Sequence, residues 1–201
     1  MTERLALETL TGDLATSVPA VDARTTGRYG DGLGSENEER QVELLLEHLR
    51  GVDEHYRGID REVPYPDGSG RCDLVLPTGT PVEAKLIRYW RANGDPEPNT
   101  YTHVFSPFHR NTLLSDAARL RGSGFEAPYG LLGLFYARTE DDPQTVEALP
   151  ERYTAEEVAA KVVRDVGYWY GADVSVCGIS YFDGLRHTVH GRGAVISWLV
   201  E

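Results

Sequence analysis

Lysine is scarce in this chain: of its 20 basic residues only two are lysines, Lys85 and Lys161, and the rest are arginines. No apolar run approaches the roughly 20 residues of a transmembrane helix, and the first residues lack the pattern of a signal peptide. The two cysteines, Cys72 and Cys177, fit no zinc spacing. These absences argue against a membrane, secreted or zinc-ribbon protein, and we expect a cytoplasmic protein with two buried thiols.

Basic charge is also in short supply, since the formal net charge is −12 over 201 residues. Such a balance argues against non-specific coating of nucleic acid, which needs a basic surface. It leaves room for a nuclease, because acidic residues can gather in a metal site. A GC-rich genome would explain the general preference for arginine. A lysine that persists beside acidic residues is then more informative, because an ammonium is a compact point charge rather than a planar fork.

The chain length predicts one domain with an appendage. We expect an N-terminal extension over residues 1–34, with a short helix over 1–15 and a linker over 16–34, followed by a single domain over 35–201. Ser35 is the expected N-cap of a helix over 36–49, whose apolar residues recur with helical periodicity. Further strands are expected at 55–65, 71–76, 81–87, 129–137, 173–182, 185–190 and 194–200, helices at 111–121 and 154–166, and loops at 88–110 and 138–152.

One group of residues carries recognisable chemistry: Asp73, Glu83 and Lys85. If residues 77–79 form a three-residue turn, Asp73 lies opposite Glu83 and Lys85 follows on the same sheet face. The other face then carries only apolar residues. Two carboxylates about 5 Å apart at Cβ could share one divalent cation. A solvated strand face with a cross-strand Lys–Glu pair is the plain alternative.

Asp73 followed by Glu83-Ala84-Lys85 resembles the PD-(D/E)xK nuclease superfamily, which has the restriction-endonuclease-like fold. The resemblance covers residues 35–137 as an αβββαβ core, with residues 138–201 adding further strands. It departs from the family pattern at Cys72, where the family name implies proline, and in a short gap between Asp73 and Glu83.

The resemblance implies a mixed central sheet flanked by helices and a Mg²⁺- or Mn²⁺-dependent endonuclease that hydrolyses DNA. Asp73 and Glu83 would bind the metal together with the Ala84 carbonyl, and Lys85 would assist the water or stabilise the transition state. A helical glutamate would add a ligand; Glu39 is our choice, with Glu38 and Glu43 as rivals. A role in genome defence or restriction is implied by resemblance only.

The loop after Lys85 interleaves basic and aromatic residues, as nucleic-acid contacts do. Its candidate nucleic-acid-binding residues are Arg88, Arg91, His103, His109 and Arg110. A lid that packs its own aromatic residues is the equally weighted alternative. His187 and His190 lack a third ligand, which favours an exposed strand pair over a metal site.

Several alternatives remain at this level. RNA instead of DNA as substrate, and a non-catalytic nucleic-acid- or protein-binding module on the same fold, are both compatible with the sequence. A homodimer or a partner protein could supply affinity for DNA, and the apolar strand over 194–200 could be internal or pair between subunits.

Overall fold

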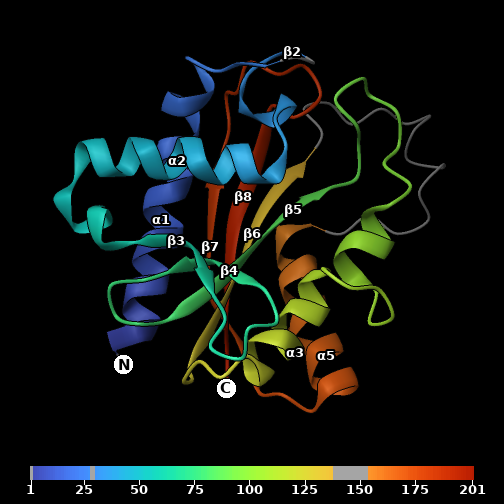
Figure 1. The fold of residues 1–201 in the computed structure, drawn as a ribbon. Coiled ribbons are helices and arrows are strands. Elements are labelled where there is room, and N and C mark those ends of the chain that lie inside the picture. Colours follow the sequence, from blue (N-terminus) through green and yellow to red (C-terminus); the bar gives the residue numbers. More distant parts are fainter. Residues whose placement is uncertain (1, 28–29, 138–153) are drawn as a thin grey trace.

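A six-stranded mixed sheet forms the centre of the protein, seen in a computed structural model that describes residues 2–27, 30–137 and 154–201 (Figure 1). The strand order is β3-β4-β5-β6-β8-β7. Only β5 and β6 run parallel, and each other neighbouring pair is antiparallel. The strands are β3 (Asp60–Pro64), β4 (Arg71–Val75), β5 (Pro81–Arg88), β6 (Tyr129–Ala137), β7 (Val174–Phe182) and β8 (Arg192–Val200).

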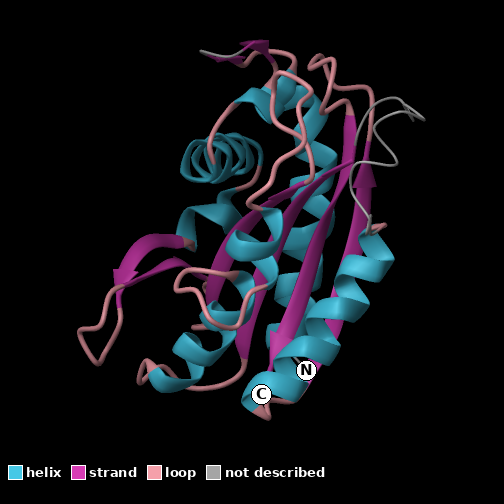
Figure 2. Ribbon diagram, turned by 90° about the vertical axis from the view of Figure 1, so that its right-hand side faces the viewer, coloured by secondary structure: helices cyan, strands magenta, loops and turns pink. Residues whose placement is uncertain are grey.

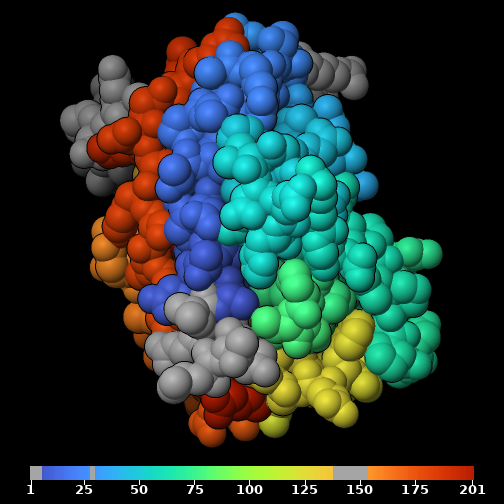
Figure 3. Space-filling model, turned by 90° about the vertical axis from the view of Figure 1, so that its left-hand side faces the viewer, coloured from blue at the N-terminus to red at the C-terminus, as the bar shows by residue number. Residues whose placement is uncertain are grey.

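Helices cover both faces of this sheet (Figure 2). Helices α1 (Thr2–Asp22) and α2 (Glu38–Val52) share one apolar core with one sheet face, and Figure 3 shows them side by side. Helices α3 (Leu113–Gly122) and α5 (Ala155–Tyr170) share the second core with the other face. The expected α/β class with a mixed sheet flanked by helices is therefore confirmed. The shorter elements are β1 (Thr26–Gly27), β2 (Gly30–Asp31), two 3-10 helices (Leu33–Ser35 and Glu54–Gly58) and a π-helix (Tyr101–Phe105).

Helix α1 corrects the expectation for the first 34 residues. It continues past the expected end at residue 15 into the expected linker as far as Asp22, with Pro19 inside it. Its buried apolar residues recur every three to four positions, which is the spacing of one helical face. Burial of that face against the sheet outweighs the local signals of Thr, Pro and Gly on which the linker prediction rested. The buried residues are Leu7, Leu10, Leu14, Val18 and Val21.

Two further boundaries differ from the sequence-based expectation. Helix α2 begins at Glu38 because Asn37, not Ser35, accepts a hydrogen bond from the Arg40 backbone N–H at 2.9 Å. Residues 54–58 form a 3-10 helix, so only Asp60–Pro64 of the expected strand pairs with β4. The capping box of Thr154 and Glu157 at the start of α5 is confirmed. The expected loop over 138–152 lies outside the described residues.

The C-terminal region forms two strands rather than three. Strand β8 lies between β6 and β7, so its apolar residues are buried inside one chain and the alternative of pairing between subunits is wrong. Residues 185–190 form no strand, and His187 and His190 are buried rather than exposed. Their rings stack at 4.9 Å, and the ring nitrogens of His190 lie 2.9 Å from the carbonyl oxygens of Gly34 and Trp90. These backbone partners make the pair part of the packed core.

Both cysteines are free and buried, as expected. In the described ranges, no helix combines the length and apolar character that crossing a bilayer requires.

Candidate active site

The β4–β5 hairpin has the register that the sequence predicts. Leu74 pairs with Val82 and Val75 pairs with Pro81, which places the turn over residues 77–79. The predicted apolar row is also confirmed. Its residues pack into the core beneath α1 and α2, namely Leu74, Leu76, Val82, Ala84 and Leu86.

Asp73 departs from the single face that simple alternation predicts. Cys72 belongs to the core under α3 and α5, whereas Leu74 belongs to the core under α1 and α2, so β4 turns between them. Across from this turn, the partner strand β3 contains Glu62 with a φ of 52°, a backbone conformation uncommon for a residue with a side chain. The Asp73 Oδ2 accepts a hydrogen bond from the Ala84 backbone N–H at 2.7 Å. Asp73 therefore lies just before the paired part of the β4–β5 hairpin, with its carboxylate beside Ala84 of β5.

Burial raises the pKa of Asp73, although its bond to the Ala84 N–H and the nearby charges of Lys85 and Arg119 oppose the rise. Ionisation of a carboxyl with this pKa shift costs more free energy in the metal-free protein than it does in water. A cation bound beside it would recover that energy.

Lys85 is the basic centre of the site. Its Nζ lies 3.2 Å from Glu38 Oε1 and 3.6 Å from Asp116 Oδ2, which come from α2 and α3 on opposite sides of the sheet. Burial acts to lower the pKa of Lys85, but the carboxylates of Glu38, Asp116 and Asp73 outweigh it and the pKa is raised. Lys85 therefore stays an ammonium at neutral pH.

Glu83 is buried and faces α3. Its Oε1 accepts a hydrogen bond from the Tyr65 hydroxyl and lies 3.3 Å from the Arg119 guanidinium. Burial, together with the negative charge of Asp116, raises the pKa of Glu83 to about 8. In this arrangement Glu83 is held toward Tyr65 and Arg119, while Asp73 is held toward Ala84.

Two residues of α3, Asp116 and Arg119, belong to this site; the sequence did not indicate Asp116, and for Arg119 it favoured a solvated helical position over a phosphate contact. Asp116 is buried, and its Oδ1 pairs with Arg119 at 2.8 Å. Its Oδ2 has no hydrogen bond within the described part of the chain, and burial raises its pKa to about 6. Their spacing of three puts Asp116 and Arg119 on one helical face. Sequence does not show that this face packs against β5.

The three candidate helical glutamates have separate positions. Glu38 contacts Lys85 and accepts a hydrogen bond from the Leu86 backbone N–H at 2.5 Å. Glu39 lines the same cavity as Asp73. Glu43 instead pairs with Arg40 and Arg61. The choice of Glu39 as a ligand stays a prediction, and Glu38 has the direct contact with Lys85.

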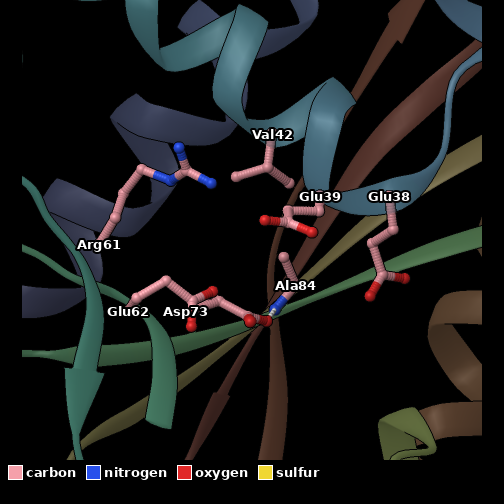
Figure 4. A pocket seen from close by; sticks show the side chains of 7 residues that line it. All are labelled: Glu38, Glu39, Val42, Arg61, Glu62, Asp73 and Ala84. Carbon is pink, nitrogen blue, oxygen red and sulfur yellow. Dashed lines mark hydrogen bonds between the residues drawn. The ribbon is translucent and has the colours of Figure 1, made fainter.

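A cavity of about 200 Å³ lies between α2 and the strands β3, β4 and β5 (Figure 4). In Figure 4, the Glu39 side chain extends from α2 toward the Asp73 carboxylate and Ala84. Carboxylate and carbonyl oxygens are the ligands that Mg²⁺ and Mn²⁺ prefer. The donor chemistry therefore fits such an ion. The residues around the cavity are Glu38, Glu39, Val42, Arg61, Glu62, Asp73 and Ala84.

The side chains are not gathered into a metal cluster in this arrangement. Across residues 2–27, 30–137 and 154–201, no three His, Cys, Asp or Glu side chains are placed to hold one ion together. The predicted ligand set contains three such side chains, Asp73, Glu83 and Glu39, besides the Ala84 carbonyl, and the structure does not bring these three together. For Glu83 to join Asp73 at an ion, it would have to turn away from Tyr65 and Arg119.

The loop after β5 divides into buried and exposed parts. Its aromatic residues Tyr89, Trp90 and Phe105 are buried, as the packed-lid alternative predicts, whereas Phe108 is exposed. Arg88 is half-buried and lines a second cavity together with Lys85 and His103. Arg91 pairs with Glu97 at 3.6 Å. The exposed His109 bonds to Ser106 at 2.8 Å, and Arg110 is exposed.

Comparison with known proteins adds no relative to this description. No protein-family model, no curated protein and no solved structure matches the chain.

Proposed function

We propose that the protein is a metal-dependent nuclease that hydrolyses phosphodiester bonds of DNA on a restriction-endonuclease-like fold. The observation that supports it most is the position of Lys85 beside an oxygen-lined cavity. This partly buried ammonium contacts Glu38 and Asp116 and lies within electrostatic reach of Asp73 and Glu83. Clusters of ionisable groups with shifted pKa values are frequent at catalytic sites.

The roles follow from the chemistry of each group. Asp73, Glu83 and the Ala84 carbonyl would hold a Mg²⁺ or Mn²⁺ ion, and Glu39 would add an oxygen from α2. Such an ion polarises a phosphodiester and lowers the pKa of water. Lys85 would donate hydrogen bonds to a phosphate oxygen as negative charge develops there. Glu38 and Asp116, on either side, would hold the ammonium in place.

A non-catalytic binding module is the second candidate. One observation favours it: Glu83 already has two partners, Tyr65 and Arg119, as in a structural ion-pair network. In that case the acidic and basic residues would satisfy one another, and the loss of a single carboxylate would change stability without any effect on catalysis.

Cleavage of supercoiled plasmid in Mn²⁺ separates the two candidates. We expect nicking by the wild type, and a loss of at least about a hundredfold in Asp73→Asn and Lys85→Ala, since removal of one transition-state-stabilising group costs roughly that much. The amide of Asp73→Asn can still accept the Ala84 N–H, so its fold should persist. Glu54→Gln changes a side chain that is 85% exposed and serves as the matched control.

Equal nicking by wild type and Asp73→Asn, or no nicking by either, would reject the nuclease. Labelled DNA and RNA of one sequence, incubated in parallel, then identify the substrate. We expect faster cleavage of DNA.

A further inference from the structure

Arg88, the last residue of β5, is a half-buried cation, and the carboxylates that line the recess beside it belong to Glu38 and Glu97. Burial lowers the pKa of its guanidinium, and the negative charge of Glu97 offsets part of that decrease. No carboxylate in the described ranges lies within ion-pair distance of Arg88, and Glu97 is engaged with Arg91 at 3.6 Å. A guanidinium has five N–H donors in a fixed planar fork, so a half-buried arginine that forms no ion pair keeps donors for a further partner. Arg88 is therefore suited to an anion that the protein itself does not supply.

The space in front of Arg88 is large enough for a nucleotide. It is a recess of about 380 Å³, within the range of small-molecule sites. Lys85 and Glu38 form its boundary with the proposed catalytic cavity, because Glu38 lines both. The recess thus begins directly beside the lysine that would contact the reacting phosphate.

Amide groups around the recess are set to donate hydrogen bonds. The Oδ1 of Asn37 accepts the Arg40 N–H at 2.9 Å, and the Oδ1 of Asn111 accepts from Arg119 at 2.9 Å. Each of these two amides therefore keeps its NH₂ for another partner. Asn111 has a φ of 61°, a left-handed conformation that asparagine tolerates better than most residues. Asn99 and His103 line the same recess.

We infer that this recess binds one unpaired nucleotide next to the scissile phosphate, with Arg88 on its phosphate and the asparagines on acceptor atoms of its base. The inference rests on the proposed nuclease function and names its substrate class: single-stranded DNA, or a strand from which one nucleotide is turned out. A paired base is stacked inside the duplex and cannot enter a recess without leaving the stack.

Binding can be measured without cleavage by fluorescence anisotropy in EDTA. The probes are a labelled single-stranded DNA 12-mer, its duplex, and a 12-mer of the same length that carries only abasic deoxyribose phosphates. We expect the single strand to bind at least about tenfold more tightly than either other probe. Arg88→Gln should weaken single-strand binding about tenfold, as loss of a charge-assisted hydrogen bond does. Asn99→Ala should weaken it several-fold. Arg57→Gln, a change to an exposed arginine that does not line the recess, should leave it unaltered.

Each other result overturns the inference. Equal affinity for single strand and duplex would show that binding does not require an unpaired nucleotide. Equal affinity for the abasic strand would show that the recess contacts phosphate and not a base. Unchanged binding in Arg88→Gln, with an unchanged unfolding midpoint, or no binding of any probe, would reject the site. The two proposals fail separately, because this assay needs no cleavage. If the wild type cleaves plasmid but Arg88→Gln binds single strands as the wild type does, the nuclease proposal stands and the nucleotide site is rejected.

Discussion

Replacement of Glu83 by glutamine should stabilise the metal-free protein at neutral pH. The pKa of Glu83 is about 8 in the fold, whereas the pKa of an unperturbed glutamate is 4.5. A carboxyl with a raised folded pKa contributes fully below its unfolded pKa, and the contribution is lost as pH rises through the folded pKa. The wild type should therefore lose stability relative to Glu83→Gln between pH 4.5 and pH 8.

The magnitude follows from the interval between these pKa values. Since pH 7 lies about 2.5 units above the unfolded pKa, the wild type has lost about 3 kcal/mol of stability at that pH relative to a form with a neutral side chain, at 1.36 kcal/mol per unit. Asp116 titrates together with Glu83, so part of this difference belongs to the pair. We therefore expect the stability difference between Glu83→Gln and wild type to grow by 1–3 kcal/mol, an order-of-magnitude range, from pH 5 to pH 7.5. Glutamine keeps an oxygen that accepts from Tyr65 and Arg119.

Urea unfolding of both proteins in EDTA at several pH values measures this difference. Titrating groups that do not interact with Glu83 act equally in both proteins and cancel. Glu54→Gln is the control, because its side chain is 85% exposed. A difference between Glu83→Gln and wild type that stays constant from pH 5 to pH 7.5 would refute the proposed environment of Glu83.

Three other changes test separate parts of the structure. Leu14→Ala should lower the free energy of unfolding by about 2–5 kcal/mol if α1 belongs to the core, and an effect below about 0.5 kcal/mol in urea unfolding would restore the view of a separate extension. Arg119→Ala should cost about 3–5 kcal/mol because it removes the guanidinium that pairs with the buried Asp116 and Glu83 and leaves Asp116 only Lys85, at 3.6 Å; the double variant with Glu83→Gln should recover part of that loss, and strict additivity would argue against the contact. Burial lowers the pKa of His190 to about 4, so the wild type should lose stability relative to His190→Gln as pH falls from 6.5 toward 4; parallel pH profiles in thermal unfolding would contradict this placement.

The hairpin at the centre of the site could be predicted because local rules determine it. A turn over residues 77–79 and an apolar row along β4 and β5 allow one register, since a shift by one residue would move the row to the wrong face. The structure has that register at Leu74–Val82. Alternation alone then predicted that Asp73 shares a sheet face with Glu83 and Lys85. The backbone conformation of Glu62 and the turn after Cys72 change the direction of the Asp73 side chain. Such irregularities depend on the neighbouring strand.

Contacts between distant elements were beyond the reach of the sequence. Asp116 lies 31 residues after Lys85 in the chain, and only the packing of α3 against the sheet brings their side chains together. Likewise, the linker prediction for residues 16–22 failed because the burial of Val18 and Val21 stabilises the helix more than the low helix propensity of the neighbouring residues destabilises it. The buried His190 was mistaken for an exposed residue because its partners are backbone carbonyls of other segments. The neighbouring His187 is buried as well, and its Nδ1 accepts from the backbone N–H groups of Val189 and His190.

The central claim is that Asp73 and Glu83 share a divalent cation beside Lys85. Crystals grown with Mn²⁺, with anomalous diffraction recorded from the metal, test it most directly. We predict one peak with oxygens of Asp73, Glu83 and the Ala84 carbonyl at about 2.0–2.6 Å, the range of hard-cation ligands, and a Glu83 side chain turned away from Arg119. A structure at saturating Mn²⁺ without a peak there, with Glu83 still held by Tyr65 and Arg119, would contradict the account.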